Sequence, residues 1–154
     1  MPIVIRPSEL SPLPGPFEVR ITVRGEDTAG AMASLEETRV PGAFVAPHTH
    51  ENDVWVYVLS GEIGVLVGDQ IDVASEGQWA LKPRNVLHAM WNTAAEPARI
   101  VEVLTPAGSE RWFEELASLA PDDGEGFDDA CRRHGIAFDR SSPWIKEIRD
   151  RFGL

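Results

Sequence analysis

Basic residues, cysteine and long apolar runs are scarce in this sequence, and each shortage argues against a class of protein. The 154 residues include 14 Lys and Arg against 25 Asp and Glu, and the formal net charge of −11 disfavours nucleic acid or an anionic membrane as a partner. No stretch approaches the roughly 20 apolar residues that span a bilayer, and the segment MPIVIRPSEL lacks the pattern of a signal peptide. Cys131 stands alone and cannot form an internal disulfide, as is usual in a reducing compartment. We therefore expect a cytoplasmic protein without nucleic-acid or membrane partners.

Proline and glycine are plentiful, and their positions indicate how the chain is organised. Five of the prolines fall within residues 1–16 and predict an extended arm, because proline interrupts helices. Across residues 17–106, short apolar or alternating segments are separated by turn residues, which predicts a barrel or sandwich of antiparallel strands. The expected strands lie near residues 17–25, 31–40, 54–59, 63–67, 71–73, 77–83, 85–92 and 98–104. The segment 31–40 has the propensity of a helix, but the flanking turn residues favour a strand.

Residues 107–154 follow a helical pattern and predict helices appended to the barrel rather than a second domain. Apolar residues recur at helical spacing in SERWFEELASLA, where Ser109 is the expected N-cap. A second helix is expected in FDDACRRHG, ending at Gly135. A third is expected in SPWIKEIRDRFG, with Pro143 at its first position and Gly153 at its end.

The segment VWVYVL, residues 54–59, is apolar on both faces. One face can line the interior of a barrel, but the other must meet the C-terminal helices or a second subunit. We therefore expect a homodimer.

Two histidines, His48 and His50, stand one residue apart at the start of this strand region. On a single strand this spacing places both imidazoles on the same face, where they can chelate one transition-metal ion. A pair of exposed or hydrogen-bonded histidines is the competing interpretation of such an isolated pattern.

The surrounding residues resemble the two sequence motifs of the cupins, a family of small β-barrels. GAFVAPHTHENDVWVYVLSG matches the first motif, G(X)5HXH(X)3-4E(X)6G, at each fixed position except the glutamate, where this chain has Val54. Gly77, Pro83, His88 and Asn92 match the second motif, G(X)5PXG(X)2H(X)3N. Asn85 replaces the glycine of that motif, which is a mild change because asparagine also adopts positive φ.

The resemblance implies an all-β fold, the cupin double-stranded β-helix or jelly-roll barrel, with the C-terminal α-helices appended. It also implies that His48, His50 and His88 bind one divalent transition metal, without distinguishing Fe, Mn, Ni, Cu or Zn. The tail, which contains WFEELASLAP and HGIAF, is similar to that of single-domain quercetin-dioxygenase-like cupins. The implied function is O2-dependent oxidation of a small aromatic or enolisable anionic substrate.

The missing glutamate leaves three interpretations open. Three histidines alone hold the metal, and the neutral ligand set then favours an anionic, chelating substrate. Alternatively Glu51, Asp53 or Glu102 supplies the carboxylate; Glu102 shares a strand face with Ile100 and Leu104 and would need a partner if buried. In the third interpretation the barrel is a metal-free or non-catalytic binding protein, or an isomerase-type enzyme.

A substrate pocket is expected around the histidines. Strand parity groups Phe44 with His48, Val56 with Val54, and Asn92 and Met90 with His88. These residues predict an apolar cavity for a flat or small organic ligand. The expected pocket residues are Phe44, Val54, Val56, Met90 and Asn92.

Overall fold

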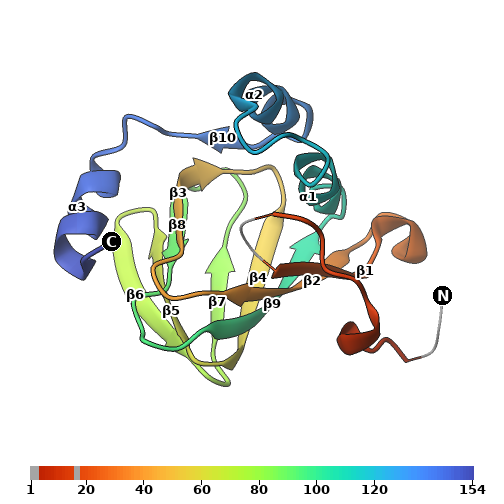
Figure 1. Cartoon of the computed structure of the whole chain (residues 1–154), viewed down its shortest axis with the longest axis horizontal. Coiled ribbons are helices and arrows are strands. Elements are labelled where there is room, and N and C mark those ends of the chain that lie inside the picture. Colours follow the sequence, from red (N-terminus) through yellow and green to blue (C-terminus); the bar gives the residue numbers. More distant parts are fainter. Residues whose placement is uncertain (1–3, 16–17) are drawn as a thin grey trace.

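Two antiparallel sheets, each of five strands, make up the body of the chain in the computed structural model, which describes residues 4–15 and 18–154 (Figure 1). The first sheet has the order β1 (Glu18–Val23), β2 (Ala33–Arg39), β9 (Ala98–Thr105), β4 (Asp53–Ser60), β7 (Trp79–Lys82). The second has the order β10 (Ala137–Phe138), β3 (Phe44–Thr49), β8 (His88–Trp91), β5 (Glu62–Val67), β6 (Gln70–Ser75). The sequence prediction of an antiparallel β-barrel is confirmed, including a strand rather than a helix within residues 31–40.

The interior between the sheets is filled by alternate residues of each strand. On β4, Val54, Val56 and Val58 are buried, whereas Trp55 between them is 43% exposed. This alternation follows from the pleat, which turns successive side chains to opposite faces. The core cluster comprises Val19, Ala33, Leu35, Val54, Val56, Val58, Ile63, Val65, Ala74, Met90, Ala98, Ile100 and Leu104.

Tight turns hold the strands in register. Gly61, between β4 and β5, has φ of +78°, and a Cβ there would lie 3.0 Å from the Cα of Ala98. The turn therefore requires both the positive φ and the close approach that only glycine allows.

Three helices follow the barrel: α1 (Glu110–Leu116), α2 (Gly124–Arg133) and α3 (Pro143–Phe152). Helices α1 and α2, with β10 beside them, lie over one end of the barrel and are called the cap below, whereas α3 lies along its side (Figure 1). Helix α3 packs Ile148 and Trp144 against Leu66 and Trp91 on the outer face of the second sheet. The expected boundaries of α3 are confirmed, since Pro143 begins it and Gly153 ends it in the left-handed conformation.

Helix α1 begins differently from the sequence expectation. Ser109 occupies the N-cap position but makes no capping hydrogen bond. The buried carboxylate of Glu110 instead accepts hydrogen bonds from the backbone N–H groups of Gly25 and Gly108. This contact ties the cap to the 3-10 helix η2 (Gly25–Thr28).

The N-terminal arm is less uniformly extended than its prolines predict. Residues Pro7–Glu9 form a 3-10 helix, η1, and Leu13 forms a bridge with Val19. Pro2 and Pro16 lie outside the described residues. In the part of the chain that the structure describes, none of the helices has the length and apolar character that crossing a membrane demands.

Candidate metal centre and its cavity

The three histidines come from two neighbouring strands and the loop between β3 and β4. His48 on β3 lies directly opposite His88 on β8, and His50 follows the end of β3. The backbone N–H of Asn85 donates a hydrogen bond of 2.8 Å to the carbonyl of His50. Asn85 has φ of +59°, so the prediction that asparagine serves in place of the motif glycine is confirmed.

Each imidazole is oriented by a carbonyl oxygen at its Nδ1. His48 Nδ1 lies 2.8 Å from Ala46 O, and His88 Nδ1 lies 2.9 Å from Val86 O. His50 Nδ1 lies 2.7 Å from its own loop, at Asn52 O. Because a carbonyl oxygen only accepts, each Nδ1 carries the proton and each neutral ring keeps its lone pair on Nε2.

The Nε2 atoms converge on one point. His48 Nε2 and His88 Nε2 lie 3.1 Å apart, and the ligand atoms of all three histidines lie within 4.8 Å of one another. Nε2 of His50 is buried and has no hydrogen-bond partner among the described residues. Facing lone pairs repel unless a cation lies between them, so this donor set fits a transition-metal ion.

Burial keeps these rings neutral. It lowers the pKa of His48 to about 3, with a further contribution from the positive charge of Lys82. Burial also lowers the pKa of His88 and of His50, again assisted by Lys82. All three histidines are thus in the protonation state that binds metals at neutral pH.

No carboxylate joins the three histidines among the described residues, where the group of potential metal ligands consists of His48, His50 and His88. Val54, at the glutamate position, is 2% exposed. The carboxylate of Asp53 is bound to Arg84 through its side chain and its backbone N–H, and Glu51 is exposed. Neither Glu51 in the loop nor Asp53 at the start of β4 therefore takes the place of the motif glutamate.

Glu102 is buried rather than facing solvent, two alternatives that the sequence left open, and its partner is a lysine. Nζ of Lys82 lies 2.5 Å from Oε1 of Glu102, and the two side chains are only 7% and 4% exposed. On the same interior face, Arg39 and Glu37 form a second buried ion pair. Four charged groups, two of each sign, therefore lie inside the barrel beside the histidines.

Burial and charge act in opposite directions on the two acids. Burial raises the pKa of Glu37 to about 7, although the charge of Arg39 opposes this shift. Burial alone would also raise the pKa of Glu102, but the charges of Lys82 and Arg39 and the hydrogen bond from Lys82 hold it below its usual value. Glu102 is therefore an anion at neutral pH.

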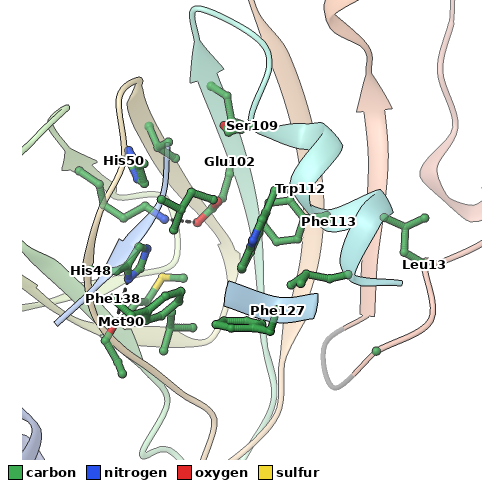
Figure 2. Close-up of a pocket in the computed structure, with 18 of the residues that line it drawn as sticks. Leu13, His48, His50, Met90, Glu102, Ser109, Trp112, Phe113, Phe127 and Phe138 are labelled. Carbon is green, nitrogen blue, oxygen red and sulfur yellow. Dashed lines mark hydrogen bonds and ion pairs between the residues drawn. The ribbon is translucent and has the colours of Figure 1, made fainter. Parts of the chain in front are cut away.

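A cavity of about 360 Å³ opens beside the histidines. The cap supplies an aromatic wall of this cavity: Trp112 and Phe113 of α1 and Phe127 of α2 lie away from the histidines, and Phe138 of β10 lies beside His48 (Figure 2). The Phe138 ring is stacked on His48, with centroids 4.8 Å apart and an angle of 26° between the planes. In Figure 2 the Glu102 carboxylate lies between His48 and His50 on one side and Trp112 on the other.

Three of the five expected pocket residues border this cavity, namely Phe44, Val54 and Met90. The ring of Phe44 packs with the cluster under α3 and lies 5.6 Å from the guanidinium of Arg149. A β-bulge between Val45 and His48 shifts the register, so Val45 rather than Phe44 shares the interior face with His48. The parity argument failed here because a bulge adds a residue to one strand.

The structure places the other two expected pocket residues elsewhere. Val56 is wholly buried in the core cluster. The amide of Asn92 donates to the carbonyls of Arg39 and Glu96 and accepts from the backbone of Ala94. Asn92 therefore holds loop backbone together instead of facing a ligand.

Sequence reasoning missed Lys82, Arg39 and the aromatic wall of the cap. Lys82 stands two residues after Ala80 in an alternating strand, and this parity was the one sequence feature that could have placed it on the interior face. Trp112, Phe127 and Phe138 carried no signal, because only the docking of the cap brings them to the barrel.

Comparison with known proteins finds a cupin model along part of the barrel. Residues 35–104 match the family model described as the Cupin domain. No curated protein sequence matches the chain significantly.

Solved structures share this fold at low sequence identity. A protein described as a predicted oxalate decarboxylase from Thermotoga maritima is 19% identical and has a TM-score of 0.63, and the match covers 68% of this chain and 99% of that chain. KdgF from Halomonas sp. is 16% identical with a TM-score of 0.60, covering 72% and 99% of the two chains. The polyketide cyclase RemF from Streptomyces resistomycificus is 20% identical with a TM-score of 0.58, covering 68% and 80%. These structures share the fold of this chain, a double-stranded β-helix barrel, which is followed here by three helices.

Proposed function

Since the matched domain and the fold support the cupin superfamily, we propose that this chain is a metal-dependent, O2-using oxidoreductase of the quercetin-dioxygenase-like kind. Its substrate is a small aromatic or enolisable anion. The observation that carries the proposal is the convergence of three neutral, buried Nε2 atoms from His48, His50 and His88. When bound there, a divalent transition metal supplies Lewis acidity and redox chemistry.

The charge inside the cavity supports an anionic substrate. The three imidazoles are neutral and the Lys82–Glu102 pair has no net charge. The Arg39–Glu37 pair is neutral when Glu37 is ionised and positive when Glu37 holds its proton. A divalent ion in this environment keeps its full positive charge, which a substrate carrying an enolate, catecholate, thiolate or carboxylate group would offset. Buried charges require such compensation.

The cavity wall supports a small, flat substrate. A volume of about 360 Å³ lies near the lower end of ligand pockets. Phe138 and Trp112 offer ring faces against which an aromatic ligand stacks. The cap covers this end of the barrel and keeps water away from the bound substrate.

Metal analysis of protein purified without a histidine tag tests the proposal directly. We expect one transition-metal ion per chain, or its uptake on reconstitution, together with a rise in melting temperature that reflects binding to the folded state. His88→Ala should abolish both effects. His134→Ala is the matched control, because His134 pairs with Glu115 in the cap and is not part of the cluster.

A metal-free binding protein or isomerase-type cupin is the competing function. It predicts that the wild type takes up no metal on reconstitution and that His48→Ala leaves ligand affinity and melting temperature unchanged. For metal-loaded protein, O2 consumption in the presence of catechols and β-diketones then tests the oxidative reaction. If the protein takes up metal but consumes no O2 with any such substrate, the proposed metal site is supported and the proposed oxidoreductase activity is wrong.

A homodimer remains part of the proposal. The outward side chains Trp55 and Trp79 are 43% and 58% exposed, and Tyr57 packs against Trp79. Exposed aromatic residues on one sheet face are typical of protein interfaces. Sedimentation should detect a dimer, and Trp79→Glu should dissociate it; a monomeric wild type would contradict the expectation.

A further inference from the structure

The ion pair between Lys82 and Glu102 spans strand β4 at the position of the missing glutamate. Lys82 lies directly opposite Val54 on one side of β4, and Leu104 lies opposite Val54 on the other. Glu102 lies opposite Val56, which makes it a diagonal neighbour of Val54 on the same interior face. Diagonal neighbours in antiparallel strands are about 7–8 Å apart, within reach of long side chains. The carboxylate of Glu102 therefore lies diagonally across from Val54, the position at which the cupin motif has its glutamate.

This carboxylate needs a cation. The charge of Arg39 also acts on it, but Arg39 is paired with Glu37, which leaves two further positions that can supply a direct partner. Glu102 is 3% exposed and ionised, and burying an unpaired carboxylate is costly. In the structure the cation is Lys82, whose Nζ lies 2.5 Å from Oε1. The other candidate is a metal at the histidine cluster.

Lys82 is close to that cluster as well. Its charge acts on all three imidazoles, and Glu102 acts on His48 and His50. Lys82 borders the same cavity as Glu102, His48 and His50. Figure 2 labels the last three residues. The ammonium and a metal ion would thus compete for a single carboxylate.

We propose that Lys82 holds Glu102 away from the metal, and so keeps the three-histidine ligand set neutral and open to an anionic ligand. This inference rests on the proposed metal site. Lys82 is a positioning residue, because it acts through the carboxylate that it binds. Val54 completes the arrangement, since its side chain has no atom that binds either the metal or Lys82.

Lys82→Met tests the proposal, because methionine keeps an unbranched stem without the charge. Without the ammonium, Glu102 should turn to the metal. With Co(II) as the probe, we expect binding to tighten at least about tenfold, the scale on which neighbouring groups tune metal sites. The visible spectrum of bound Co(II) should also change, because an oxygen ligand joins the nitrogens. Both effects should disappear in Lys82→Met/Glu102→Gln.

Three further variants separate coordination from general effects. Lys82→Arg keeps the ion pair and should keep the wild-type spectrum. Arg84→Met removes a cation from the exposed ion pair with Asp53 and should leave both Co(II) affinity and spectrum unchanged. Glu102→Gln alone should leave the spectrum unchanged, because Glu102 is not a ligand in the wild type; a changed spectrum would overturn the proposal even if Lys82→Met did not fold.

The outcomes distinguish this inference from the proposed function. If the wild type and Lys82→Met bind Co(II) with the same spectrum, the metal site stands and the inference is wrong. Tighter binding without a spectral change would be a through-space effect of the lost charge and would also contradict it. If the wild type takes up no Co(II), the metal site itself is absent and the inference falls with it.

Discussion

Lys82 lies directly opposite Val54 in the β4–β7 ladder, so a lysine faces the position where the cupin motif has its glutamate. The lysine is compensated by Glu102 on the other side of β4. The interior thus keeps a carboxylate, but pairs it with an ammonium.

Val54→Glu should convert the site to the ligand set of the motif. In metal-loaded protein the new carboxylate should tighten metal binding by about tenfold or more and weaken the binding of anionic ligands. In metal-free protein it should lower the free energy of unfolding by about 2–4 kcal/mol, because Val54 is 2% exposed and Lys82 is already paired. Val54→Gln is the neutral control and should not tighten metal binding. Equal metal affinity for Val54→Glu and Val54→Gln would show that a carboxylate at position 54 does not reach the metal, which would contradict the match to the motif.

Metal-free protein should lose stability as the pH falls below about 6.5. Burial lowers the pKa of His48 to about 3 and lowers the pKa values of His50 and His88 in the same direction. Between these values and the usual value of 6.5, the unfolded state binds more protons than the folded state. The stabilisation is therefore complete above pH 6.5 and declines on acidification by up to about 1.4 kcal/mol per pH unit for each histidine.

Glu37 acts in the opposite direction. Burial raises its pKa from 4.5 to about 7, so its contribution is present at low pH and is lost as the pH rises through that window. Glu37 takes up one proton in the folded state, whereas three histidines take up protons only on unfolding. The net effect of acidification is therefore still a loss of stability. Urea denaturation of metal-free protein between pH 5 and 7 measures the slope. His88→Ala should flatten it, and a flat wild-type profile would be inconsistent with three buried neutral rings.

Phe138→Ala should weaken binding of aromatic ligands more than it weakens the fold. The ring stacks on His48 and borders the cavity, but it is only partly buried. We expect a loss of about 1–2 kcal/mol in stability, below the cost of deleting a fully buried phenylalanine. Phe152→Ala is the control, because Phe152 packs on Trp91 away from the cavity. Calorimetric titration with catechol as the probe should separate the two variants; equal affinities would remove Phe138 from the binding site.

Gly64→Ala should destabilise the second sheet. A Cβ at Gly64 would lie 2.1 Å from the indole nitrogen of Trp91, which is fully packed beneath α3. Relieving the overlap requires Trp91 to move, at a cost of about 1–3 kcal/mol or more. Gly124→Ala should be close to neutral, because a Cβ at Gly124 meets no atom within 4 Å. Thermal unfolding of the two variants provides the comparison.

The strand pattern and the two motifs were sufficient to predict the barrel and the three converging histidines. Alternation on a pleated strand is a local property, which is why Val54, Val56 and Val58 were correctly expected on one face. Positive φ at Asn85 is also local, since it follows from the turn chemistry of one residue. Parity failed at Phe44, where a bulge shifts the register of β3. It also failed at Asn92, which lies beyond the end of β8 and binds loop backbone.

The sequence by itself determined the fold class and the helix boundaries of α3, because each depends on neighbours a few residues apart. The metal-ligand candidates followed from the resemblance to the two cupin motifs, since His48 and His88 lie forty residues apart. Tertiary structure alone decided which charge Glu102 meets, since Lys82 is twenty residues away and approaches across a third strand. It also decided the aromatic wall, because Phe138 reaches His48 only when β10 pairs with β3. Contacts between residues far apart in sequence depend on how whole elements pack, and no local pattern encodes that.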